Sequence, residues 1–407
     1  MVRSPSFRAL LLGALVTLSC SSSNSNPPAS GTGGVSVSGS GGAVSPGSGG
    51  ATGSGGAPLG SGGAPAGSGG APGSGGAGAG PIGTGGRAAG SGGAQGGGSS
   101  GSTNPGNAGD GEMDIGPNYT RSPDLTLRPG APAGMSHSFS LSSAQSQIFN
   151  GSDFNPPLSW TRTITWFVPQ QYVDGTAAPF MVSSDGFFGG LRTTVQNLAG
   201  DPNPDHQVPA LAIIGIEAGP NNSPSERSLE YDTVSDRYWQ FVTKEVIPAV
   251  LADPVLKQAY PNFKLTSDPN GRGGYGCSSG GPAVMGLAWF GDFNRVFSFS
   301  GSYTALHTTP DHPFGAWEYP SMITAAPFRP DLRVFLEVGQ NDNGSTTPDA
   351  NHRNWVTSNR SMFAALTAKG NHVQFVFAAG AGHCDDNPRN QITPEGMIWL
   401  WRGYQPQ

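Results

Sequence analysis

Short apolar runs recur along the chain from residue 163 onward, and each is bounded by Gly, Pro, Asn or Asp. Runs of this length that are rich in apolar and β-branched residues are typical of buried strands. They predict strands at residues 163–168, 179–183, 210–216, 296–300, 334–338 and 373–378.

Segments with helical spacing of apolar residues lie between these runs. One helix is predicted to begin near Ser235 or Asp236, which are both good N-cap residues. Its apolar stripe consists of Tyr238, Phe241, Val242, Val246 and Val250. Residues 355–369 and 394–401 predict two more helices. Buried strands that alternate with helices predict an α/β fold, with a mainly parallel central sheet and helices on both faces.

The amino-terminal quarter of the chain has a different composition. Residues 31–109 contain 35 of the 65 glycines and one charged residue, Arg87, and no aromatic residue occurs between Phe7 and Tyr119. Copies of Gly-Ser-Gly-Gly-Ala begin at positions 47, 53, 60, 67, 73 and 90. No position in these copies carries a large apolar side chain that could build a core. Residues 21–113 are therefore predicted to be a disordered, flexible tether.

Residues 1–20 have the pattern of an export signal. Arg3 and Arg8 supply a positive region before a short apolar run, residues 9–18, which is too short to be typical of a transmembrane helix. The run ends at Cys20, followed by serines, and resembles a bacterial lipoprotein signal whose cysteine carries the lipid, although Thr17 replaces the usual leucine. An ordinary secretory signal is the alternative. Both predict an exported protein, secreted or held at the cell surface, with no membrane contact beyond a lipid on Cys20.

Length and charge restrict the class of protein further. The chain has 407 residues and a formal net charge of −6. Residues 114–407 hold nearly all the aromatic residues and are numerous enough to form one domain with a sizeable core. The absence of Lys and Arg runs argues against a nucleic-acid partner. The absence of a second long apolar segment argues against a polytopic membrane protein.

Gly276, Ser278 and Gly280 form the pattern Gly-x-Ser-x-Gly, which in α/β-hydrolases places a nucleophilic serine on a tight turn between strand and helix. Side chains at the two glycine positions would clash in such a turn. An apolar segment at residues 282–290 predicts the helix that follows. The amide of Ser279 would then lie at the helix amino terminus and donate to an oxyanion. A plain Gly/Ser turn is the alternative, because the pattern is weak in a glycine-rich chain.

His383 is the predicted general base. It follows the predicted strand at residues 373–378 and a Gly-Ala-Gly turn, and it lies downstream of the serine as this fold requires. His352 is the main alternative. We also assign His352, together with Trp355, to substrate binding.

Asp342 is the predicted acid. The predicted strand at residues 334–338 ends just before it, and α/β folds place their chemistry at the carboxyl ends of strands. Asp349 is the second candidate, and a helix-capping role is the alternative for Asp342. In the predicted triad, Ser278 attacks an acyl carbon, His383 takes and returns the proton, and Asp342 orients the imidazole.

Two cysteines, Cys277 and Cys384, lie in the predicted domain, one beside the proposed nucleophile and one beside the proposed base. If the serine and histidine side chains meet, their neighbours come to disulfide range, about 5.5 Å between Cα atoms. An exported protein can keep such a bond, so a Cys277–Cys384 disulfide is predicted, with two buried free thiols as the alternative. Their spacing is unlike that of a zinc site, and no metal is predicted.

The same positions resemble the CS-D-HC arrangement of tannases and fungal feruloyl esterases, in which a disulfide joins the neighbours of the serine and the histidine. The resemblance is carried by Cys277-Ser278, Asp342 and His383-Cys384 and is limited to them. The lid domain of that family is not recognisable here.

A broader resemblance, over residues 162–403, is to the esterase family that includes enterochelin esterases and esterase D. It is carried by residues 184–186, 236–248, 272–281, 334–342, 354–355, 382–383 and 399–402. It implies an α/β-hydrolase fold, ester hydrolysis without a cofactor, and a second oxyanion donor from the backbone around Gly186 and Phe187, where a simple turn is the alternative. The cysteine pair and the tether depart from the family pattern, which puts a cytoplasmic siderophore role in doubt.

These features predict an exported serine esterase that acts on a small-molecule or polysaccharide-linked ester, with residues 301–328 contributing to its pocket. Two other functions fit the same sequence. A non-catalytic hydrolase fold could bind carbohydrate or another polymer through exposed Trp239, Trp317 and Trp355. An acyltransferase could use the same triad.

Overall fold

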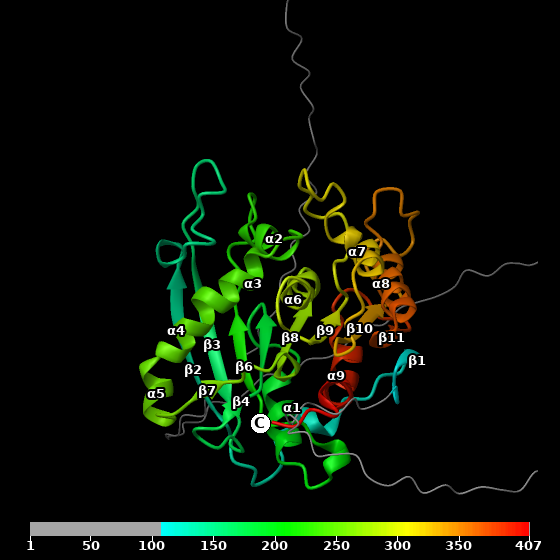
Figure 1. The fold of residues 1–407 in the computed structure, drawn as a ribbon. Helices are drawn as coiled ribbons and strands as arrows, with labels where there is room; N and C mark the ends of the chain where they lie inside the picture. The colour runs from blue at the N-terminus through cyan, green and yellow to red at the C-terminus, as the bar shows by residue number, and fades with distance from the viewer. Residues whose placement is uncertain (1–106, 407) are drawn as a thin grey trace, which may run out of the picture. The chain divides into compact units, whose positions relative to one another are not determined.

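The computed structural model describes residues 107–406, in which a mainly parallel sheet is covered by helices on both faces (Figure 1). The predicted signal, Cys20 and the tether up to residue 106 lie outside the described residues. Strand β1 (Gly111–Ile115) begins three residues before the predicted start of the domain. None of the described helices combines the length and hydrophobicity needed to cross a membrane.

The described part of the chain forms a nine-stranded sheet. From edge to edge, its strands are β1, β11 (His372–Ala378), β10 (Arg333–Gly339), β9 (Arg295–Phe299), β8 (Arg272–Cys277), β5 (Phe180–Ser184), β6 (Ala212–Ile216), β3 (Thr161–Val168) and β2 (Met135–Ser142). β3 runs antiparallel to both of its neighbours, and the other neighbouring strands are parallel. The carboxyl ends of the parallel strands therefore lie along one edge of the sheet, at the top of Figure 1.

The helices connect these strands and cover the sheet. They are α1 (Leu191–Ala199), α2 (Glu226–Tyr231), α3 (Arg237–Phe241), α4 (Ile247–Ala252), α5 (Pro254–Ala259), α6 (Gly280–Trp289), α7 (Tyr319–Ala325), α8 (Trp355–Lys369) and α9 (Asp386–Trp401). A π-helical segment (Val242–Val246) joins α3 to α4. A separate small sheet pairs β4 (Ala177–Ala178) with β7 (Lys264–Leu265).

Both faces of the sheet are buried, which explains the continuous apolar runs in the sequence. Successive residues of a strand point to opposite faces. On β10, Val334, Leu336 and Val338 pack in the cluster that contains residues of α6 and α8, whereas Phe335 packs with residues of α1 and α9. The sheet is thus the middle of three layers.

The six predicted strands are confirmed as β3, β5, β6, β9, β10 and β11, each within two residues at either boundary. The helix predicted at residues 355–369 is α8, and the one predicted at residues 394–401 is the last part of α9, which begins earlier. Strands β1, β2 and β8 were not among the predicted strands.

Candidate active site

Ser278 lies on the turn between β8 and α6. Its φ of 57° is in the left-handed region, which is costly for a residue other than glycine. The turn is held by its neighbours, since the N–H of Ser278 donates to the carbonyl of Phe299 at 3.0 Å. A Cβ at Gly276 would lie 2.2 Å from the carbonyl oxygen of Gly280, and a Cβ at Gly280 would lie 3.1 Å from Ser184 Cβ. Backbone lies too close for a side chain at Gly276, and the Ser184 side chain leaves little room for one at Gly280.

Ser278, His383 and Asp342 are in hydrogen-bonding contact. Ser278 Oγ is 2.9 Å from His383 Nε2, and His383 Nδ1 is 2.6 Å from Asp342 Oδ1. Asp342 is buried, and its Oδ1 also accepts the N–H of Asn343 at 2.6 Å. A carboxylate at Nδ1 retains the imidazole proton there, which leaves Nε2 as the acceptor for the serine hydroxyl. The arrangement can take a proton from Ser278.

Two loops on neighbouring parallel strands bring the acid to the base. Asp342 follows β10 and His383 follows β11. The loops are joined where the N–H of Asn341 donates to the carbonyl of Ala381 at 2.8 Å. This backbone hydrogen bond fixes the two loops relative to each other, and it therefore fixes the position of the imidazole against Asp342.

The alternative acid and base lie apart from Ser278. Asp349 Oδ1 accepts the N–H of Asn354 at 2.8 Å. The ring of His352 stacks on Trp317, with ring centroids 4.6 Å apart. The helix-capping alternative for Asp342 does not describe the structure either, because the N-cap of α8 is Asn354.

The three residues predicted to donate to the oxyanion, Ser279, Gly186 and Phe187, differ in whether their amides already have an acceptor. Ser279 is the N-cap residue of α6, so its amide lies at the positive end of a helix dipole. Gly186 requires a correction, because its N–H already donates to the carbonyl of Ile216 at 3.0 Å. Among the described residues, the amides of Ser279 and Phe187 have no hydrogen-bond acceptor. Of the two residues predicted for the second donor, Phe187 stays the candidate and Gly186 does not.

A disulfide joins Cys277 to Cys384, with their Cα atoms 6.2 Å apart. The bond ties the residue before Ser278 to the residue after His383. The N–H of Cys384 also donates to Ser300 Oγ at 3.0 Å, which anchors the loop to the end of β9.

Within the described residues, no three His, Cys, Asp or Glu side chains are grouped to hold a metal ion.

Trp355 requires a second correction. Its indole is only 7% exposed, and its ring meets the edge of His383 at a centroid distance of 5.7 Å. Its N–H donates to Ser302 Oγ at 3.0 Å. This burial leaves almost none of the ring to contact a substrate, so the structure supports neither a substrate-binding role nor the exposed position that the polymer-binding alternative required.

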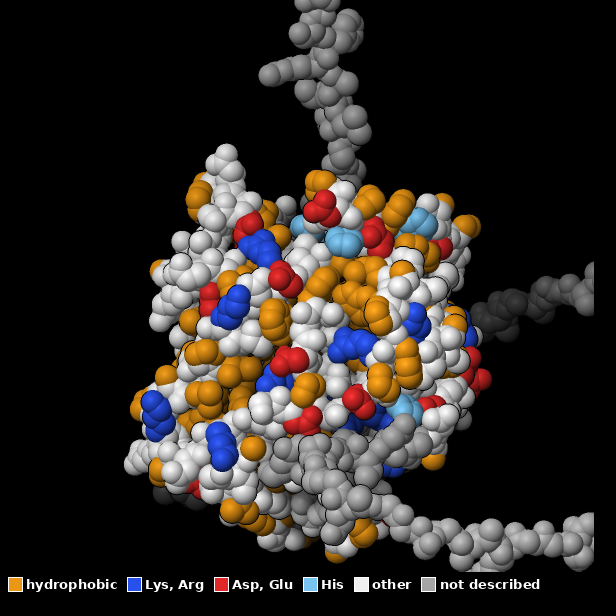
Figure 2. All heavy atoms as spheres, in the orientation of Figure 1, with side chains coloured by type: hydrophobic (Ala, Val, Ile, Leu, Met, Phe, Trp, Pro, Cys, Tyr) orange, Lys and Arg blue, Asp and Glu red, His pale blue; other side chains and the backbone are white. Residues whose placement is uncertain are grey.

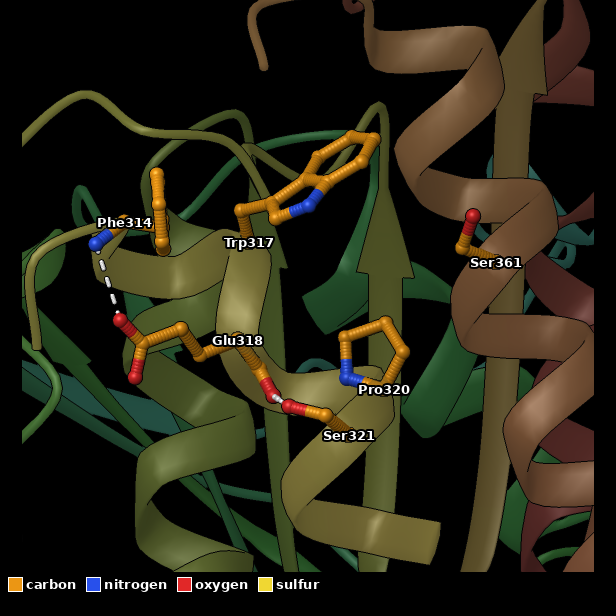
Figure 3. A pocket seen from close by; sticks show the side chains of 6 residues that line it. All are labelled: Phe314, Trp317, Glu318, Pro320, Ser321 and Ser361. Atoms are coloured by element: carbon orange, nitrogen blue, oxygen red, sulfur yellow. Dashed lines mark hydrogen bonds between the residues drawn. The ribbon is translucent and has the colours of Figure 1, made fainter.

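A cavity of about 320 Å³ opens in the predicted pocket region (Figure 3). Its lining residues are Phe314, Trp317, Glu318, Pro320, Ser321 and Ser361. Figure 3 shows Ser361 on α8 facing the segment that carries the others. The face drawn in Figure 2 has hydrophobic side chains beside histidine and acidic ones at the end where the parallel strands terminate. None of Ser278, His383 and Asp342 lines this cavity. His352 stacks on Trp317, and its role in substrate binding stays a prediction.

Sequence reasoning missed Ser302, whose Oγ lies 3.4 Å from Ser278 Oγ. It follows β9, the strand next to β8, and therefore reaches the same edge of the sheet. Its place in the loop that begins after a predicted strand was the available signal. Its contact with Trp355 could not be read from the sequence, because it joins two distant segments.

Glu337 is a buried carboxyl beneath the candidate site. Burial raises its pKa to about 8, and the nearby Asp342 carboxylate adds to the rise. At pH values between the ordinary pKa of 4.5 and the raised pKa of about 8, Glu337 holds a proton in the folded protein that it releases in the unfolded chain. The stability of the wild type should therefore fall as pH rises through this window.

Replacing Glu337 by glutamine should remove this decline, because the amide cannot ionise. Urea unfolding at pH 5 and at pH 8.5 gives the measurement. The stability of Glu337→Gln relative to the wild type should increase between the two pH values. An unchanged difference would show that Glu337 is ionised in the folded protein.

Comparisons with known proteins show the family of the chain. The sequence profile of the family described as "Putative esterase" matches residues 156–385, which is more than half of the chain. No curated protein sequence matches.

Solved structures similar to the chain include three esterases or related hydrolases. A ferulic acid esterase is 17% identical, with 67% of this chain and 100% of that chain covered and a TM-score of 0.45. An enterobactin esterase from Shigella flexneri is 18% identical, with 68% and 60% covered and a TM-score of 0.46, so this chain spans about three fifths of its length. An S-formylglutathione hydrolase from Agrobacterium tumefaciens is 13% identical, with 66% and 96% covered and a TM-score of 0.43.

Proposed function

The chain belongs to the Putative esterase family and is a carboxylic ester hydrolase, and from this premise we propose that it works as an exported serine esterase. Ser278 is the nucleophile, His383 the general base and Asp342 the residue that orients the imidazole. The observation that carries the proposal is the pair of contacts at His383, 2.9 Å to Ser278 Oγ and 2.6 Å to Asp342 Oδ1. Contacts in this order are the signature of an activated serine.

Acylation forms a bond between Ser278 Oγ and the acyl carbon of the ester. The hydroxyl proton passes to His383 Nε2, and the carbonyl π electrons move to the carbonyl oxygen. The tetrahedral intermediate collapses when the carbon–oxygen bond to the alcohol breaks and His383 returns its proton to the leaving oxygen. The product of this half-reaction is an acyl-enzyme on Ser278 and a free alcohol.

Deacylation repeats the same steps with water. His383 takes a proton from the water as its oxygen bonds to the acyl carbon, and the proton then passes to Ser278 Oγ as the acyl–serine bond breaks. The amides of Ser279 and Phe187 are the donors that we assign to the oxyanion in both halves. Donors aimed at this charge lower the barrier, and each is worth about 10²- to 10³-fold in rate.

The proposed substrate is a small-molecule or polysaccharide-linked carboxylic ester. The cavity beside Phe314 and Trp317, about 320 Å³ in volume, has no lining residue from the triad and does not define the size of the acyl group. His352 stacks on Trp317 and is the sequence-predicted substrate contact that lies at this wall.

The export part of the proposal rests on the signal-like residues 1–20 and on the Cys277–Cys384 disulfide. Disulfides persist mainly in oxidising compartments. A lipid on Cys20 with residues 21–113 as a tether would hold the enzyme at the cell surface. Mass analysis of the amino terminus of the mature protein tests this directly, and a mature chain that begins elsewhere than Cys20 would exclude the anchor.

A fluorophosphonate probe tests the nucleophile. It reacts only with a serine whose hydroxyl is activated. The probe should modify the native enzyme once, and peptide mapping should place the adduct on Ser278 rather than on the adjacent Ser279. Heat-denatured enzyme is the control and should not react. A native enzyme that takes no label, or takes it on another residue, would overturn the assignment.

A further inference from the structure

Ser302 makes two side-chain contacts at the nucleophile. It is fully buried, with 0% of its surface exposed. Its Oγ is 3.0 Å from Trp355 Nε1 and 3.4 Å from Ser278 Oγ. Its backbone N–H donates to the carbonyl of Ser278 at 3.0 Å. The hydrogen bonds of its backbone N–H and of its hydroxyl therefore hold the Ser302 side chain beside the nucleophile.

The direction of each hydrogen bond in this chain is set by its two ends. An indole N–H can only donate, so Ser302 Oγ accepts from Trp355. At the other end an ionised carboxylate can only accept, so His383 Nδ1 donates to Asp342, and Nε2 must accept the Ser278 proton. Among the described residues, the one remaining acceptor for the Ser302 hydroxyl proton is Ser278 Oγ.

We propose that Ser302 is a further catalytic residue, whose hydroxyl donates to Ser278 Oγ during the reaction, and that Trp355 is the residue that positions this hydroxyl. The proposal rests on the proposed function, because it assigns a donor to the nucleophile of that triad. It adds two groups, Ser302 and Trp355, to the triad, which gives a single directed chain of five groups from the indole to the carboxylate.

The donor acts on the charge that forms on the nucleophile. As the Ser278 proton passes to His383, negative charge develops on Oγ before the bond to the acyl carbon is complete. Ser302 keeps its own proton and stabilises this charge. The 3.4 Å separation is long for two hydroxyls, and it shortens as charge develops, because hydrogen bonds to ionised oxygen are shorter. In deacylation Ser278 Oγ is the leaving group, and the same donor assists its departure.

Three variants test the proposal in the full-length enzyme. Ser302→Ala should lower kcat/KM on p-nitrophenyl acetate by about 10- to 100-fold, less than an oxyanion donor because the contact is longer. Trp355→Phe removes the indole N–H but keeps a ring against His383, and it should lose less. The double variant, which leaves neither partner unpaired, should match Ser302→Ala. Losses that multiply in the double variant would overturn the positioning role of Trp355.

A second readout separates catalysis from structure. The rate of fluorophosphonate labelling should fall in Ser302→Ala by the same factor as kcat/KM, whereas competitive inhibition by the product acetate should not change. Thr194→Val is the matched control, since Thr194 on α1 is also buried and its hydroxyl has no hydrogen-bond partner among the described residues. It should behave as the wild type does.

The outcomes distinguish this proposal from the proposed function. A wild type that takes no label on Ser278 removes the triad and the role of Ser302 together. A labelled wild type with Ser302→Ala within twofold of its labelling rate leaves the triad intact and overturns the role of Ser302 alone.

Discussion

Turnover of p-nitrophenyl acetate falls on the order of 10⁵-fold when Ser278 is replaced by alanine, because no other hydroxyl in the described part of the chain lies against His383 Nε2. His383→Ala should lose a similar factor. Asp342→Asn should lose about 10⁴-fold, because an amide does not hold the imidazole in the tautomer that accepts the serine proton. Steady-state kcat of the purified variants, checked for folding by circular dichroism, gives the measurement.

The controls for this series come from the competing residues. Asp349→Asn should keep kcat within a few-fold, since Asp349 bonds to the backbone of Asn354. His137→Gln, at a histidine that bonds to Asp253 and is not a candidate base, should do the same. The Ser278→Ala/His383→Ala double variant should be no slower than either single variant, because the two act as one unit. A large loss in Asp349→Asn with little loss in Asp342→Asn would reverse the assignment of the acid.

The parts of the fold that could be predicted are those where sequence and burial agree. β10 is buried on both faces and reads as an apolar run. β8 was missed because three of its six residues are glycines. Tertiary packing explains the glycine at position 274, because a Cβ at Gly274 would lie 2.5 Å from the side chain of Val284 on α6. The central strand is glycine-rich because the nucleophile helix packs directly on it, and no local pattern carries this information.

The two edge-side strands were missed for a different reason. β1 is exposed along most of its length and pairs with one neighbour, β11, so it carries almost no apolar pattern. β2 alternates serine with other residues and is largely exposed. β1 depends on pairing with β11, near the other end of the described chain, and β2 depends on pairing with β3, the next strand. Sequence periodicity reports neither pairing.

The triad was within reach of the sequence because each member follows a recognisable strand. The groups that support it were not. Gly186 was assigned from resemblance, but pairing of β5 with β6 uses its amide. Ser302 and Trp355 meet only because the loop after β9 crosses the start of α8. Chain order thus identifies the reacting groups, whereas their environment depends on which strands are neighbours.

Removing the disulfide should weaken both the fold and the site. Cys277→Ala/Cys384→Ala opens a loop that spans 107 residues, which in the chain-entropy model lowers the free energy of unfolding by about 5 kcal/mol. For a domain of this size, that corresponds to a fall in Tm of about 10 °C. Activity should fall as well, because the bond fixes the backbone on either side of the contact between Ser278 and His383. Calorimetry and kcat/KM measure the two effects separately.

The temperature of the assay decides which effect is observed. At 20 °C the double variant should still be folded, so a loss of kcat/KM there reports the position of His383 rather than unfolding. Reduction of the wild type should reproduce the loss, and slowly, because Cys277 is buried. Ser300→Ala is a useful companion, because it removes the other tie on this loop, the acceptor of the Cys384 N–H, and leaves the disulfide in place. If the double variant loses stability but keeps full kcat/KM at 20 °C, the loop hydrogen bonds alone hold the base, and the disulfide acts only on the unfolded chain.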